Sequence, residues 1–156
     1  MNYVLALAVG IGIVAGLRTF TAPAAASWAG YLGWLNLHGT PLAFMGSVIT
    51  VGIFSLLAVI EYITDQLPST PARTVPMQLI ARLIMGALAG ACLCAGNGQS
   101  WLVGACLGVV GTLIGTYGGY HIRKALVTGL KVKDIVIAIP EDLVAIGLAY
   151  FIVSSR

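Results

Sequence analysis

Four segments of about 20 mainly apolar residues constrain this chain more than any other feature of its sequence. They cover residues 42–62, 77–96, 101–120 and 135–154, and polar or turn-forming stretches separate them. Because an α-helix rises about 1.5 Å per residue, each segment is long enough to cross a hydrocarbon core of about 30 Å. The sequence therefore predicts an all-α, polytopic membrane helix bundle with membrane lipids around it.

The composition excludes most soluble folds. Hydrophobic residues make up 59% of the 156 residues and charged residues only 8%, whereas charged residues are about 25% of an ordinary soluble domain. The formal net charge of +3 comes from scattered Lys and Arg side chains, so nucleic acid is not an expected partner. The three cysteines lie in apolar runs and are interpreted as packing residues. We expect a single domain over residues 1–156 and no cofactor.

The first crossing is harder to define, because the apolar run over residues 3–17 ends at Arg18. A run of about 15 residues is too short to span a bilayer, so the crossing must continue through residues 19–24. Arg18 and Pro23 are then inside the membrane, and we expect this helix to be broken at Pro23 and the last one at Pro140. Residues 28–37 are rich in aromatic residues and glycine and are expected either to lie on the far interface or to re-enter the membrane.

The distribution of positive charge predicts an orientation. With about five spanning helices, one side receives most of the basic residues and the other receives only Arg156. The basic side carries Arg73, Arg123, Lys124, Lys131 and Lys133. We therefore expect a cytoplasmic amino terminus and an external carboxyl terminus in a bacterial inner membrane. An odd number of spanning helices would orient the first and fourth helices oppositely, which is the arrangement needed for an inverted repeat. A short alignment of the two segments, with Arg18 placed on Arg123, gives weak support for such a repeat.

Glycine is abundant, with 20 residues, and many of them recur at spacings of three or four. Such spacing puts them on shared helix faces, where another backbone can approach closely. The faces are formed by Gly12 and Gly16, by Gly86 and Gly90, and by Gly104, Gly108, Gly111, Gly115, Gly118 and Gly119. Two interpretations remain: tight packing within the bundle or in a homo-oligomer, or a flat face that lines a path or lets a neighbouring element slide.

Ionisable residues inside the apolar segments are the candidates for a functional site, since each costs about 3 kcal/mol on insertion scales. Glu141 and Asp142 follow Pro140 near the expected midplane, and their candidate partners are Arg18 and Arg82. Glu61 and Asp65 are four residues apart and share a helix face. One interpretation is an interfacial pair held by Arg73. The other is an acidic cluster, formed with Glu141 and Asp142, that faces Arg18 and Arg82 in a shared polar site.

Three motifs together resemble a known family. They are the sequence Gly16-Leu17-Arg18-Thr19-Phe20, the spaced residues Glu61, Asp65, Pro68, Pro71 and Arg73, and the pair Glu141-Asp142. In this order they are similar to the small bacterial membrane proteins of the domain-of-unknown-function 4126 family. The resemblance covers nearly the whole chain and implies a bacterial inner-membrane protein, while it leaves the activity open.

Two functional hypotheses follow from the charged residues. The first is a small transporter or channel for an ion or small solute, in which Glu141 and Asp142 bind the cation or proton and Arg18 is the counter-charge or an anion contact. The alternative is a membrane-embedded, metal-dependent enzyme that acts on a lipid or prenyl substrate, with Glu61, Asp65 and Arg73 near a phosphate. A structural or assembly partner of another membrane protein is a third option.

Overall fold

The computed structural model describes residues 2–64, 76–130 and 134–154, and all regular secondary structure within them is helical. This confirms the all-α prediction. The elements are α1 (Asn2–Leu17), α2 (Thr21–Tyr31), the short 3-10 helix η1 (Ala43–Gly46), α3 (Val48–Thr64), α4 (Pro76–Gly96), α5 (Trp101–Leu130) and α6 (Asp134–Ser154). The predicted sites Asp65 and Arg73 lie outside the described residues.

Helices α1, α4 and α5 form the centre of the bundle, and glycine allows their backbones to touch. A side chain added at Gly12 would collide with the carbonyl of Gly108, and one at Gly90 with that of Gly104. Helix α5 thus packs against α1 on one face and α4 on another. The predicted glycine faces are therefore used largely within the chain, so an oligomer would need other surfaces.

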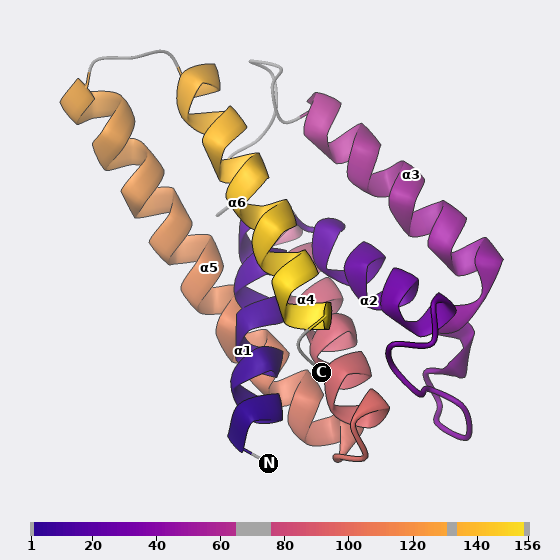
Figure 1. Cartoon of the computed structure of the whole chain (residues 1–156). Helices are drawn as coiled ribbons and strands as arrows, with labels where there is room; N and C mark the ends of the chain where they lie inside the picture. Colours follow the sequence, from indigo (N-terminus) through magenta and orange to yellow (C-terminus); the bar gives the residue numbers. More distant parts are fainter. Residues whose placement is uncertain (1, 65–75, 131–133, 155–156) are drawn as a thin grey trace.

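Helices α1 and α5 run in the same direction, which contradicts the expected inverted relation between them. Gly12 lies against Gly108, and further along both helices Gly16 lies against Thr116. The two helices are parallel because α2 returns the chain toward its starting side before α3 begins (Figure 1). The inverted repeat is therefore wrong for this pair of helices.

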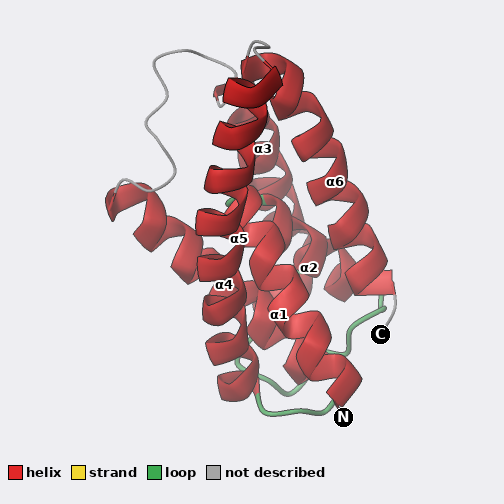
Figure 2. Cartoon of the chain, turned by 90° about the vertical axis from the view of Figure 1, so that its left-hand side faces the viewer, coloured by secondary structure: helices red, strands yellow, loops and turns green. Residues whose placement is uncertain are grey.

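The two ends of the chain lie at the same end of the bundle, as both views show (Figures 1 and 2). Ile152, near the end of α6, lies against Gly10 in α1. The prediction of termini on opposite sides counted one crossing for residues 3–24. The structure folds that stretch into two helices, α1 and α2, and α2 returns toward the end of the bundle where α1 starts. This extra reversal places both termini at the same end of the bundle.

The first crossing is interrupted, but at a different residue from the one predicted. Helix α1 ends at Leu17 and α2 begins at Thr21, so the interruption covers residues 18–20, and Pro23 lies in the first turn of α2. A first-turn proline is tolerated because its missing N–H would have no partner in the helix. Helix α6 continues through Pro140, so the predicted break there is not seen.

Within the part of the chain that the structure describes, two helices are long and apolar enough to cross a bilayer: Met77–Gly96 and Trp101–Leu130. Tyr3–Leu17 and Val48–Ile63 are shorter apolar helices. Helix α3 is the outermost element in Figure 1 and packs mainly against α2 and η1. Much of its surface is apolar and exposed, including Ile49 at 71% and Leu56 at 61%. Exposed apolar surface of this extent is typical of a face that meets lipid or another protein.

Candidate functional site

The candidate site is the interruption between α1 and α2, which we call the α1–α2 break (residues 18–20). It lies in the interior, and Arg18 is completely buried. An interrupted helix leaves carbonyl groups without partners where the first part ends and N–H groups without partners where the second part starts. Buried backbone groups must be satisfied, so the surrounding helices have to supply donors and acceptors.

Glu61 of α3 supplies the acceptors at the start of α2. Its Oε2 accepts a hydrogen bond from the backbone N–H of Thr19 at 2.8 Å, and its Oε1 accepts one from that of Phe20 at 3.2 Å. The residue before α2, Phe20, has an apolar side chain and cannot cap the helix itself. A carboxylate at a helix amino terminus also interacts favourably with the helix dipole. Glu61 therefore acts as the cap of α2 from another helix.

Arg82 of α4 supplies donors at the end of α1. Its Nη1 donates to the carbonyl of Gly16 at 2.8 Å and approaches that of Ala15 at 3.5 Å. The hydroxyl of Thr116 on α5 reaches the Gly16 carbonyl from another side, at 3.5 Å. A cation at a helix carboxyl terminus is favoured by the dipole. The absence of a side chain at Gly16 lets these groups approach its carbonyl.

Tyr62 connects Arg18 to the start of α2. The guanidinium carbon of Arg18 lies 5.6 Å from the centroid of the Tyr62 ring, within the range of a cation–π interaction. The Tyr62 hydroxyl shares a short hydrogen bond with Oγ1 of Thr21 in the first turn of α2. Two consecutive residues of α3 therefore contact the α1–α2 break.

The structure brings together three of the predicted site residues: Arg18, Glu61 and Arg82. Glu141 is half-buried on α6 and Pro140 beside it is exposed, while Pro23 is buried in α2. The backbone of Asp142 is described, but its side chain, like Asp65 and Arg73, lies outside the described part. The proposed convergence of all four acids therefore remains a prediction. Across the described residues, no three His, Cys, Asp or Glu side chains are grouped closely enough to hold a metal ion.

Sequence reasoning missed the roles of Tyr62, Thr21 and Thr116. Tyr62 directly follows Glu61 and could have been noticed as a hydroxyl beside a buried acid. Thr21 belongs to the polar stretch after Arg18, which marked the first crossing as irregular. Thr116 lies one turn after Thr112 in the glycine-rich helix, and no sequence signal distinguishes it from an ordinary packing residue.

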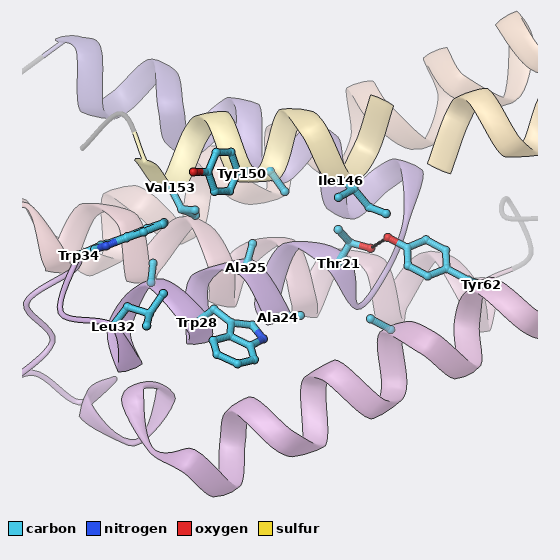
Figure 3. A pocket seen from close by; sticks show the side chains of 13 residues that line it. Thr21, Ala24, Ala25, Trp28, Leu32, Trp34, Tyr62, Ile146, Tyr150 and Val153 are labelled. Carbon is cyan, nitrogen blue, oxygen red and sulfur yellow. Dashed lines mark hydrogen bonds between the residues drawn. The ribbon is translucent and has the colours of Figure 1, made fainter. Parts of the chain in front are cut away.

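An apolar groove adjoins the α1–α2 break (Figure 3). It has a volume of about 310 Å³ and lies between α3 and α6, with α2 along its floor. At one end are Thr21 and Tyr62, joined by their hydrogen bond. At the other end are Trp34 and Tyr150, whose rings meet edge to face with centroids 6.1 Å apart. The groove thus extends from the charged interior toward the end of the bundle that holds both termini.

No curated protein and no solved structure matches the chain. Its sequence does match a protein family described as a domain of unknown function, DUF4126, over residues 5–155. The match includes both helices of the α1–α2 break and the residues Glu61 and Arg82 that hold it. The chain belongs to the DUF4126 family, as its three sequence motifs predicted.

Proposed function

We propose that this protein is a small multi-pass membrane transporter or channel, and that the α1–α2 break binds its solute. The observation that carries the proposal is the pair of opened helix ends held by ionisable side chains from two other helices. Interrupted helices with exposed backbone groups are the usual ion and substrate sites of secondary transporters.

The groups at the break suit an anion as the solute. Arg18 and Arg82 are buried there together with Glu61. The two N–H groups that Glu61 occupies, those of Thr19 and Phe20, are the kind of donors that hold anionic groups at helix amino termini. An anion that displaces the Glu61 carboxylate takes over these donors, with the Arg18 guanidinium nearby.

Helix α3 is the element best suited to move during this exchange. It packs mainly against α2 and η1. Glu61 and Ser55 accept hydrogen bonds from the break and from Trp28 of α2, and Tyr62 shares one with Thr21. Displacing Glu61 removes two of these bonds. Solute binding would thus be coupled to a shift of α3 away from α2, which opens a route to the break.

The positive-inside rule gives the orientation that accompanies this proposal. The exposed Lys124 lies in the last third of α5, and α5 ends at the end of the bundle opposite both termini (Figure 1). We place this basic end in the cytoplasm. Both termini are then outside the cytoplasm, in a bacterial inner membrane. Protease protection of tags at the two ends, in inside-out vesicles, would check this placement.

Anion flux in proteoliposomes tests the proposal. We expect current on a solid-supported membrane with at least one member of a panel of small inorganic and carboxylate anions. Arg82→Gln should abolish it, because the end of α1 loses its cation. Glu61→Gln should bind the anion more tightly and turn over more slowly, because the competing carboxylate is gone. Lys124→Gln is the matched control and should transport normally. An anion flux that is unchanged in both the Glu61 and the Arg82 variants would exclude the break as the transport site.

A further inference from the structure

The apolar groove between α3 and α6 needs an occupant. Its lining is almost entirely apolar, and the hydroxyls at its inner end, those of Thr21 and Tyr62, bond to each other. Water is a poor occupant, because an apolar cavity that offers few hydrogen-bond partners stays dry. The occupant must therefore be apolar.

The dimensions of the groove match one leaflet of a bilayer. Helix α2, which forms its floor, has 11 residues, so it is about 16 Å long, close to half of a hydrocarbon core of about 30 Å. Trp34 and Tyr150 lie at its outer end (Figure 3). Trp and Tyr are the residues enriched where a membrane protein meets the headgroup region. The groove thus extends from the level of an interface to the middle of the membrane.

The volume decides between a lipid chain and a protein segment. A helix of about 10 Å diameter and 16 Å length would need roughly 1,200 Å³, about four times the 310 Å³ of the groove. A single hydrocarbon chain is about 4–5 Å across and takes roughly 200–300 Å³ over the same length. One extended chain therefore fits in the groove, whereas a whole helix is too large to enter it.

We infer that the groove holds one hydrocarbon chain of a membrane phospholipid. The headgroup lies at the Trp34–Tyr150 end, and the tip of the chain reaches the Thr21–Tyr62 pair. In this position the chain keeps water away from the α1–α2 break from the side of α3 and α6, where the low dielectric strengthens the bonds of Glu61. The inference is independent of the transport proposal, because it concerns a lipid site whether or not a solute moves.

Native mass spectrometry of the protein, released from nanodiscs of palmitoyl-oleoyl phosphatidylglycerol, tests the inference. We expect one lipid to be retained per chain at detergent levels that strip the rest. The double variant Ala25→Leu, Ala58→Leu fills the groove from α2 and α3 and should lower retention about tenfold. Ala125→Leu on the exposed surface of α5 is the matched control. Absence of a retained lipid in the unaltered protein, or equal retention in the filled variant, would refute the inference.

A second measurement does not require the filled variant to fold. Of the three tryptophans, Trp28 and Trp34 line the groove, whereas Trp101 begins α5 and is 41% exposed. Phosphatidylglycerol with brominated chains, at low ratio to detergent, should quench a Trp101→Phe variant more strongly than a Trp28→Phe, Trp34→Phe variant. Equal quenching of the two variants would mean that only bulk lipid is sensed, and would count against a bound chain.

Discussion

Replacing Glu61 with glutamine tests the central contact of the α1–α2 break most directly. The carboxylate accepts two backbone N–H groups, those of Thr19 and Phe20, and is only 8% exposed. Glutamine has a single oxygen, so one N–H loses its acceptor, which costs about 1–3 kcal/mol when buried. The lost interaction of the charge with the α2 dipole adds about 0.3–2 kcal/mol. We expect Glu61→Gln to lower the free energy of unfolding by about 1–5 kcal/mol.

Two measurements check this expectation in mild detergent. Denaturant unfolding followed by circular dichroism should give the loss of stability, and hydrogen exchange should show faster exchange of the Thr19 and Phe20 amides than of those in the middle of α4. Glu141→Gln is the comparison variant, since Glu141 is half-buried on another helix. Unchanged stability together with slow exchange at Thr19 and Phe20 would refute the assignment of Glu61 as the cap of α2.

Two further predictions concern packing and the neighbouring hydroxyl. Gly12→Ala should destabilise the bundle by about 2 kcal/mol, because the added methyl group collides with the Gly108 carbonyl. Gly147→Ala has open space around it and should be neutral or stabilising by up to about 1 kcal/mol, so equal melting temperatures for the two variants would contradict the packing. Tyr62→Phe should cost about 1 kcal/mol by removing the bond to Thr21, and no change in thermal unfolding would show that this bond contributes little.

Much of the helical architecture was readable from the sequence, because long apolar runs leave few alternatives to helices. The burial of Arg18, Glu61 and Arg82 was also predictable, since charges inside such runs have to be sheltered. The bonding partners of these three residues were not predictable from the sequence. Glu61 and Arg82 bond to backbone groups of the break, and a sequence does not show which backbone N–H and carbonyl groups will need partners from other helices.

The reversal between α1 and α2 is the feature that sequence reasoning misjudged. Hydropathy reports how far an apolar stretch extends but not whether it turns back, so residues 3–24 were counted as one crossing. Pro23 predicts an interruption because proline breaks helix interiors, yet it lies in the first turn of α2, where a helix tolerates it. The actual interruption is at residues 18–20, where partners on α3 and α4 satisfy the backbone. Those partners come from distant parts of the chain.

The dependence of the α1–α2 break on later residues has a consequence for biosynthesis. Both of its charged partners, Glu61 and Arg82, are translated after α1 and α2. Until they arrive, the open helix ends have to be hydrated or held by the insertion machinery. The first two helices therefore cannot settle into lipid one at a time, and the nascent chain reaches its final arrangement only once α4 is inserted.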